Sequence, residues 1–181
     1  MSTYVALLRG VNVSGVVLKM DRVRELWAGL GFKEVRTYLQ SGNVIFLAAD
    51  PPAKWLTAIE KKIADTMGRQ VAVIVRTPAD LKSVIEKNPY KARTGIEPSR
   101  LAVAFLNGIP LKNAAQGLER FCSGGEEFHV AGREIFLYCP NGLGSTKLTN
   151  NAIEKALAVK ATSRNWNTIN KLHELASPET L

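Results

Sequence analysis

The strongest constraint on this chain is the order in which short apolar runs and amphipathic stretches alternate in its N-terminal half. An apolar run at residues 4–8 has the length of a buried strand. A helical pattern around Val23, two strands joined at 41–43, a second helical pattern around Ile59 and a strand at 71–75 follow it. This β-α-β-β-α-β order is that of the ferredoxin-like unit, in which two helices cover one face of a four-stranded antiparallel sheet. The other face is then solvated, covered by another element or used for binding.

A further helix and a linker are expected next. Thr77 has the side chain of an N-cap, and Pro78 suits the first position of a helix. The segment 91–100 contains both glycine and proline and is the expected linker. These features predict a first domain over residues 1–90, which ends with the trailing helix, and a second domain over residues 101–181.

The second half repeats the rhythm of the first. The expected elements are a strand at 101–106, a helix opened by Pro110, strands at 127–130 and 134–138, a helical stripe from Leu148 to Leu157, and a last helix capped by Ser163. The glycine turns at 41–43 and 131–133 each precede an aromatic strand pattern, which indicates a duplicated unit. The predicted fold class is therefore α+β: a ferredoxin-like β-α-β-β-α-β unit, then a second related βαββα unit and C-terminal helices.

Three blocks of sequence carry a family resemblance. They are residues 4–13 (YVALLRGVNV), 36–46 (RTYLQSGNVIF) and 162–168 (TSRNWNT). In this order and at these separations they resemble the bacterial DUF 1697 family, a domain of unknown function, over essentially the whole chain. The resemblance implies a soluble bacterial α+β protein built of ferredoxin-like units. It implies no established activity, cofactor or catalytic residue.

Polar residues gather where the first strand and the first hairpin end. Arg9, Asn12 and Ser14 follow the first strand among glycines, and Gln40 and Asn43 flank the hairpin tip. Arg9 could clamp a phosphate or carboxylate bidentately while Asn12 orients it. The alternative is structural: Arg9 pairs with a nearby carboxylate, and the asparagines make turn hydrogen bonds.

A second group of candidate ligand-binding residues lies near the C-terminus. On the helix expected from Ser163, Arg164 and Asn167 share one polar stripe, close to free N–H groups at the helix start. Lys147 and Asn150 open the preceding helix after a glycine-containing turn, which could bring further N–H groups to the same place. The alternative is a solvated amphipathic face.

Several function classes find no support in the sequence. Cys122 and Cys139 lack metal-ligand spacing, and a packing role is favoured for both, so no metal site is expected. Dinucleotide, P-loop, zinc-protease and serine-hydrolase motifs are missing, so no cofactor is expected, and whether the chain is an enzyme stays open. Without a signal segment or a long apolar run, a soluble cytoplasmic protein without a membrane partner is expected.

The charge favours an anionic partner. The net charge is +8, from 24 Lys and Arg against 16 Asp and Glu, and it divides into +5 (13 − 8) over residues 1–90 and +3 (11 − 8) over residues 91–181. The hypothesis ranked first is a small phosphate- or carboxylate-bearing ligand in a cleft between the two units. The alternatives are binding of RNA or single-stranded nucleic acid and a structural dimerisation module without a ligand. The oligomeric state is left open.

Overall fold

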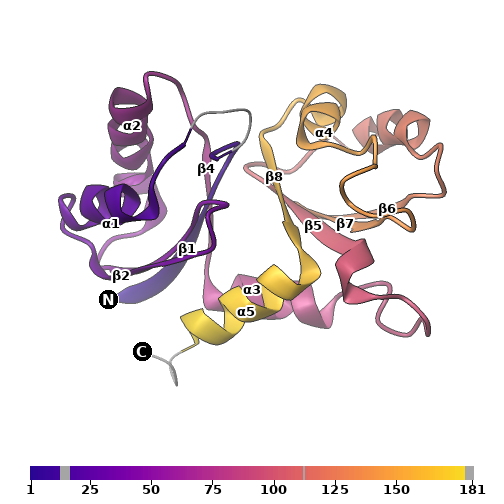
Figure 1. The fold of residues 1–181 in the computed structure, drawn as a ribbon, viewed down its shortest axis with the longest axis horizontal. Coiled ribbons are helices and arrows are strands. Elements are labelled where there is room, and N and C mark those ends of the chain that lie inside the picture. Colours follow the sequence, from indigo (N-terminus) through magenta and orange to yellow (C-terminus); the bar gives the residue numbers. More distant parts are fainter. Residues whose placement is uncertain (13–16, 112, 178–181) are drawn as a thin grey trace. The chain divides into compact units, whose positions relative to one another are not determined.

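A computed structural model describes residues 1–12, 17–111 and 113–177 of the 181-residue chain. Close packing divides the chain into two units (Figure 1). The first unit comprises Met1–Lys82 with Leu172–Leu181, and the second comprises Ser83–Lys171. Each unit has its own four-stranded sheet and its own apolar core, as the predicted α+β class requires.

The first unit contains the predicted elements in the predicted β-α-β-β-α-β order. They are β1 (Ser2–Leu8), α1 (Met20–Ala28), β2 (Lys33–Tyr38), β3 (Asn43–Ala48), η1 (Pro52–Lys54), α2 (Leu56–Met67) and β4 (Val73–Arg76). The strands pair in the order β2-β3-β1-β4, and all the pairs are antiparallel. Both α1 and α2 lie on one side of this sheet (Figure 1).

The core of the first unit forms because alternate strand residues face α1 and α2. Ala6 and Leu8 of β1 and Phe46 of β3 are buried together with Trp27 of α1 and Ile59 of α2. Burying a side chain of the size of leucine or phenylalanine contributes about 1.5–3 kcal/mol. Because successive side chains of a strand point to opposite faces, the position of a residue along β1 determines whether it packs against the helices.

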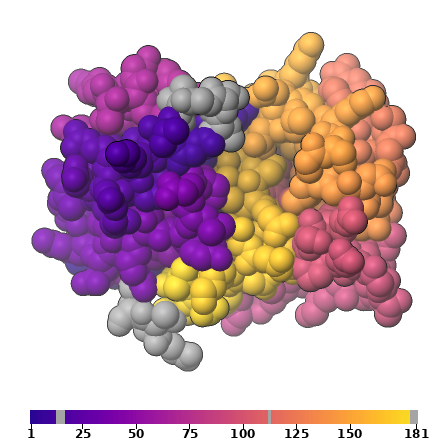
Figure 2. Space-filling view, in the orientation of Figure 1, coloured from indigo at the N-terminus to yellow at the C-terminus, as the bar shows by residue number. Residues whose placement is uncertain are grey.

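The second unit follows the same order. Its elements are η2 (Pro98–Arg100), β5 (Leu101–Leu106), η3 (Ala114–Phe121), β6 (Glu127–Ala131), β7 (Glu134–Tyr138), α4 (Asn150–Leu157) and β8 (Ala161–Asn165). The strands pair antiparallel in the order β6-β7-β5-β8, which matches the first sheet strand for strand. Figure 2 shows the orange segment that includes α4 as part of the visible surface.

A helix follows the last strand of each sheet. The first, α3 (Pro78–Glu86), begins as predicted: Thr77 Oγ1 accepts the N–H of Asp80 at 3.1 Å, and Asp80 Oδ2 accepts the N–H of Thr77 at 2.8 Å. These reciprocal bonds form a capping box. The second, α5 (Trp166–Ala176), is capped by Asn165, whose Oδ1 accepts the N–H of Asn167 at 2.9 Å.

Two predictions about the second unit are wrong. Ser163 does not cap a helix, because it lies inside β8, a strand that the sequence analysis did not predict. The hydropathy pattern does not predict this strand, because two of its buried positions are occupied by the polar residues Thr162 and Arg164 and not by aliphatic residues. The helix expected from Pro110 is a 3-10 helix that begins only at Ala114. Leu111, which directly follows Pro110, lies outside this helix and is exposed.

Hydrogen bonds at the strand ends show which residues of the two sheets are equivalent. The N–H of Leu8 donates to the carbonyl of Gly42 at 2.8 Å, and that of Leu106 donates to the carbonyl of Arg133, also at 2.8 Å. Gly42 is therefore equivalent to Arg133, and not to Gly132 as the comparison of the glycine turns suggested.

This difference of one residue changes which aromatic side chains correspond. Phe46 packs in the core beneath α1 and α2, and its equivalent in the second core is Leu137. Phe136, which the sequence comparison aligned with Phe46, precedes Leu137 in β7 and so points to the opposite face of its sheet. The duplication is present in the topology, with a register that the glycine turns alone did not reveal.

The segment 91–100 is packed against the second sheet. Arg93 Nη1 contacts Glu127 Oε2 at 2.7 Å, and its guanidinium lies 5.2 Å from the ring centroid of Tyr138. The carbonyl of Arg100 accepts the N–H of Cys139 at 2.9 Å. The division by packing falls between residues 82 and 83, whereas the linker and the domain limits drawn from the sequence stay predictions.

Candidate functional site

Asn12 joins the loop after β1 to the β2–β3 hairpin. Its Oδ1 accepts the N–H of Leu18 at 2.6 Å, and its Nδ2 donates to the carbonyl of Leu18 at 3.1 Å and to the carbonyl of Gln40. Its backbone φ of 56° lies in the left-handed region that asparagine tolerates better than most residues. The side chain of Asn12 therefore makes the turn contacts that were the structural alternative to an anion role.

Asn43 has a comparable structural role at the hairpin. It is fully buried, and its Nδ2 donates to the carbonyl of Tyr38 at 2.8 Å and to Ser41 Oγ at 2.9 Å. The neighbouring candidate, Gln40, is exposed and contributes its carbonyl to Asn12. These contacts hold the tip of the hairpin closed.

Arg9 is half-buried at the end of β1, where its N–H donates to the carbonyl of Ala72 at 2.9 Å. Arg69 Nη2 donates to the carbonyl of Gly10 at 2.6 Å. Two of the three sequence blocks, 4–13 and 36–46, thus meet within the first unit. Ser14 lies outside the described residues.

Arg164 lies in β8 and is buried, so the predicted helical stripe of Arg164 and Asn167 is wrong. Its Nη1 donates to Thr162 Oγ1 at 2.8 Å and to the carbonyl of Ser163 at 2.9 Å. Burial disfavours the charged guanidinium and lowers the pKa of Arg164 to about 10. Asn167 is exposed in the first turn of α5.

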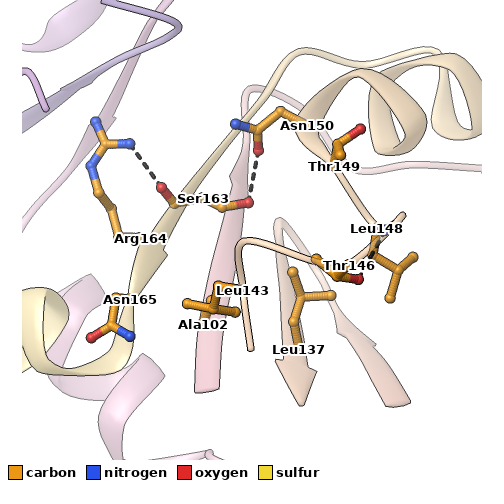
Figure 3. A pocket seen from close by; sticks show the side chains of 10 residues that line it. All are labelled: Ala102, Leu137, Leu143, Thr146, Leu148, Thr149, Asn150, Ser163, Arg164 and Asn165. Carbon is orange, nitrogen blue, oxygen red and sulfur yellow. Dashed lines mark hydrogen bonds between the residues drawn. The ribbon is translucent and has the colours of Figure 1, made fainter. Parts of the chain in front are cut away.

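A cavity of about 310 Å³ lies within the second unit (Figure 3). Its apolar wall is formed by Ala102, Leu137, Leu143 and Leu148. Its polar lining comes from the segment that leads into α4 and from β8, namely Thr146, Thr149, Asn150, Ser163, Arg164 and Asn165. The structure thus places Arg164 and Asn150 at one cavity, while Lys147 and Asn167 are not among its lining residues.

Hydroxyl and amide groups dominate the polar side of this cavity. Ser163 Oγ donates to Asn150 Oδ1 at 2.7 Å, and Thr149 Oγ1 accepts the N–H of Ala152 at 3.2 Å as the N-cap of α4. The guanidinium of Arg164 extends to the other side of β8 from the Ser163 hydroxyl, as the alternation of a strand requires (Figure 3). Arg164 therefore does not direct its charge toward the Ser163–Asn150 pair.

Charged groups flank the loop that carries Thr146. Lys147 is exposed, and Glu126 Oε2 accepts the N–H of Gly124 at 2.7 Å. The backbone N–H groups of Glu126 and Gly124 hold the pKa of the Glu126 carboxyl below its usual range, helped by the Thr146 hydroxyl and the charge of Lys147. Glu126 therefore stays ionised beside Lys147 at neutral pH.

Neither cysteine has the features of a nucleophile. Cys139 is buried and Cys122 is half-buried, and burial raises the pKa of both thiols. Both are protonated at neutral pH, in line with a packing role. In residues 1–12, 17–111 and 113–177, no group of three His, Cys, Asp or Glu side chains is placed to hold a metal ion.

The architecture and the sequence blocks point to one family. A family model described as a protein of unknown function (DUF1697) matches residues 1–136. The chain belongs to the DUF1697 family. This confirms the family resemblance, with the blocks at 4–13 and 36–46 inside the matched residues and the block at 162–168 beyond them. No curated protein matches this DUF1697 chain.

A solved structure shares the fold of this DUF1697 chain. The conserved bacterial protein SP0830 from Streptococcus pneumoniae is similar with a TM-score of 0.74 and 20% sequence identity, over 97% of this chain and 99% of that one. At this identity the similarity concerns the fold alone. No helix in the part of the chain that the structure describes is long and apolar enough to cross a membrane.

The sequence contains a signal for the strand that its residue pattern did not mark. The tetrapeptide Ala-Ile-Glu-Lys occurs at 58–61 in α2 and again at 152–155 in α4. Because a strand follows the first copy, aligning the two copies predicts a strand after the second. The alignment predicts that a strand follows but not where it lies, because equal spacing would carry β4 to residues 167–170, whereas β8 spans Ala161–Asn165.

Proposed function

We propose that this DUF1697 chain binds a small anionic ligand, with a phosphate or carboxylate group, in the cavity of the second unit. The observation that carries the proposal is the cavity of about 310 Å³ with one apolar and one polar wall. Small-molecule sites have volumes of roughly 300–1,000 Å³ and combine apolar surface with a few placed polar groups.

The polar wall supplies the donors that an anion needs. The carbonyl oxygen of the Asn150 side chain accepts from Ser163 Oγ, which leaves the Nδ2 group to donate to a ligand. Thr146 also lines the cavity, but its hydroxyl already interacts with the Glu126 carboxylate. Lys147, next to Thr146 in the chain, and the net charge of +8 favour the approach of an anion.

The first-unit candidates have no part in this site as proposed. Asn12 and Asn43 are occupied in closing a loop and a hairpin. The cleft between the two units that the sequence analysis expected stays a prediction.

Thermal-shift measurements with inorganic phosphate and a panel of phosphate- and carboxylate-bearing metabolites test the proposal. A ligand is expected to raise the Tm of the wild type and to lose this effect in Asn150→Ala. Lys147→Gln is expected to weaken binding at low salt, whereas Lys155→Gln, the same change at an exposed position in α4, is not. The proposal fails if no compound shifts the Tm, or if Asn150→Ala retains every shift.

The described part of the first sheet does not offer the surface that the nucleic-acid alternative needs. RNA-recognition sheets stack bases on exposed aromatic side chains. On the first sheet, Val5, Leu7, Ile45 and Ile74 occupy the face away from α1 and α2, and each is at most 2% exposed. Salt-dependent anisotropy changes with a short RNA, and no Tm shift with small anions, would favour nucleic acid instead.

A further inference from the structure

A second cavity, of about 230 Å³, lies within the first unit. It forms where the turn after α1 meets the end of β3 and the start of α2. Its walls include Leu30, Phe32, Ala48, Trp55 and Ala58. Aromatic and aliphatic side chains form one wall, while Asp50 and Lys54 supply the charged part of the lining, in contrast to the hydroxyl and amide groups of the second-unit cavity.

The aromatic wall of this cavity is fixed in place. The ring centroid of Trp55 lies 5.3 Å from that of Phe32 and 5.3 Å from that of Phe46, both at an interplanar angle of 75°. Its Nε1–H donates to the carbonyl of Asp50 at 2.8 Å. Edge-to-face contacts and a satisfied indole N–H hold Trp55 in one orientation, so the wall exists before a ligand arrives.

The size of the cavity suits one aromatic ring. An apolar cavity of about 150 Å³ is large enough to bind benzene. The volume of about 230 Å³ therefore accommodates a ring with a short substituent. Gly31 also lines the cavity, and a Cβ built on it would meet no atom within 4 Å, so the space beside it is open.

Two charged side chains stand at the rim. Lys54 Nζ contacts Asp50 Oδ1 at 2.8 Å, and both side chains are more than half exposed. An ammonium group has three N–H donors, and the contact with Asp50 uses one of them. A ligand cation would compete with Lys54 for Asp50, and a ligand anion would compete with Asp50 for Lys54. The net charge of +8 repels the cation and attracts the anion, so it favours the anion.

We infer that the first unit binds a small aromatic carboxylate in this cavity, with the ring against Phe32 and Trp55 and the carboxylate on Lys54. The apolar wall favours a ligand with an aromatic ring, and the Lys54 ammonium favours a substituent with a negative charge. This site is separate from the one proposed in the second unit and rests on different residues.

Two-dimensional ¹H–¹⁵N NMR with phenylacetate as the probe tests the inference, because the Trp55 indole N–H and the Gly31 amide report on the cavity directly. Saturable shifts of both signals at millimolar phenylacetate are expected. Benzyl alcohol and benzylamine, which carry the same ring without the negative charge, should bind roughly ten-fold more weakly. Shifts confined to Asn150 and its neighbours would place the ligand in the second unit and overturn the inference.

Two pairs of variants separate the ring from the charge. Ala58→Leu fills the cavity from an exposed position of α2 and should abolish the shifts, while Thr57→Leu, exposed on the same helix and outside the lining, should not. Lys54→Gln should reduce phenylacetate affinity to that of benzyl alcohol, while Lys61→Gln should leave it unchanged. Equal binding of benzylamine, or unchanged shifts in Ala58→Leu, would overturn the inference.

Discussion

Arg76 and Arg164 occupy the same position in the two sheets. Arg76 of β4 pairs with Val5 of β1, and Arg164 of β8 pairs with Val103 of β5. Each arginine donates Nη1 to the carbonyl of the residue before it, at 2.9 Å in both cases. Arg76 is 1% exposed and Arg164 is 6% exposed. A buried guanidinium is thus a repeated part of the architecture.

The position of these arginines connects each sheet to the helix that follows it. Thr77 comes directly after Arg76 and caps α3, while Asn165 comes directly after Arg164 and caps α5. The guanidinium satisfies the carbonyl that precedes it, and the next side chain satisfies N–H groups of the helix. Both units therefore use the same two-residue arrangement where a strand ends and a helix begins.

Removing either buried guanidinium should destabilise the protein. Arg76→Met and Arg164→Met keep much of the apolar stem but leave buried acceptors without their donor, which should lower the free energy of unfolding by about 1–3 kcal/mol. Urea denaturation at neutral pH measures the loss. Arg22→Met, which removes an exposed pair with Glu25, should change it by less than about 0.5 kcal/mol. Equal stability of all three variants would contradict a structural role for the two buried arginines.

A glutamate clamp is repeated in the same way. Glu60 Oε1 in α2 accepts the N–H of Val73 at 2.9 Å, and Glu154 Oε1 in α4 accepts the N–H of Ala161 at 3.0 Å. Each contact ties a helix to the first residue of the last strand. Because carboxylates are strong acceptors, Glu60→Ala should lower the free energy of unfolding by about 1.5–3 kcal/mol, and Glu60→Gln by less.

Amide hydrogen exchange checks this prediction at single residues. The Val73 amide should exchange faster in Glu60→Ala, and the Ala161 amide should exchange faster in Glu154→Ala. Each variant serves as the control for the other, since the clamps belong to different units. Unchanged exchange at Val73 in Glu60→Ala would show that the clamp does not protect β4.

Much of the fold was predictable because burial imposes a period on the sequence. The apolar residues of β1 and the stripe containing Val23 and Trp27 mark a strand and a helix, and both are present. The strand β8 was not predictable in this way, because Thr162 and Arg164 take buried positions. Their polar groups form hydrogen bonds with each other and with the backbone. These bonds depend on the folded structure, so the order of residue types does not reveal them.

The candidate site was less predictable than the fold. Of the C-terminal candidates Lys147, Arg164 and Asn167, only Arg164 lines the cavity. The direction of the Arg164 side chain depends on its place in a strand, where it points opposite to Ser163 (Figure 3). For Asn12, residue type could not distinguish a ligand contact from the bonds it makes to Leu18. An asparagine has the same donors and acceptors in both roles.

Tyr90 should make stability fall at alkaline pH. Burial, and then the negative charge of Glu127, raise the pKa of Tyr90 to about 12 from an ordinary value near 10. Between these values the folded state retains a proton that the unfolded state has lost, so the free energy of unfolding decreases as the pH rises from about 10 to 12. The full difference is at most about 2–3 kcal/mol.

Comparing wild type with Tyr90→Phe isolates this effect from other groups that titrate in the same range. The variant should lose less stability than the wild type between about pH 10 and 12, as measured by urea denaturation. Tyr38→Phe, in the first unit, is the matched control and should follow the wild type. Parallel pH profiles for the wild type and Tyr90→Phe would refute the assignment.

The hairpin glycines of the two units should differ sharply in their tolerance of a side chain. Gly42 has a φ of 76°, and a Cβ there would collide with Val11 Cγ2 and lie 2.8 Å from Leu8 Cβ. Gly132, in the β6–β7 turn, has a φ of 63°, but a Cβ there would meet nothing within 4 Å. Both positions carry backbone strain for alanine, whereas only Gly42 adds a collision with the loop that follows β1.

Gly42→Ala should therefore lower the free energy of unfolding by about 2–4 kcal/mol, from left-handed strain together with overpacking. Gly132→Ala should lower it by only about 1 kcal/mol, the strain alone.

The two variants are compared by urea denaturation, with Asn12→Asp as a further probe, since it keeps the acceptor for the Leu18 N–H but removes the donor to Gln40. If the contact between the loop after β1 and the β2–β3 hairpin stabilises the unit, Gly42→Ala and Asn12→Asp will each destabilise it. In the double variant their effects will be less than additive, because both changes disturb this loop–hairpin contact. Equal effects of Gly42→Ala and Gly132→Ala would show that the close approach to Val11 contributes nothing beyond backbone strain.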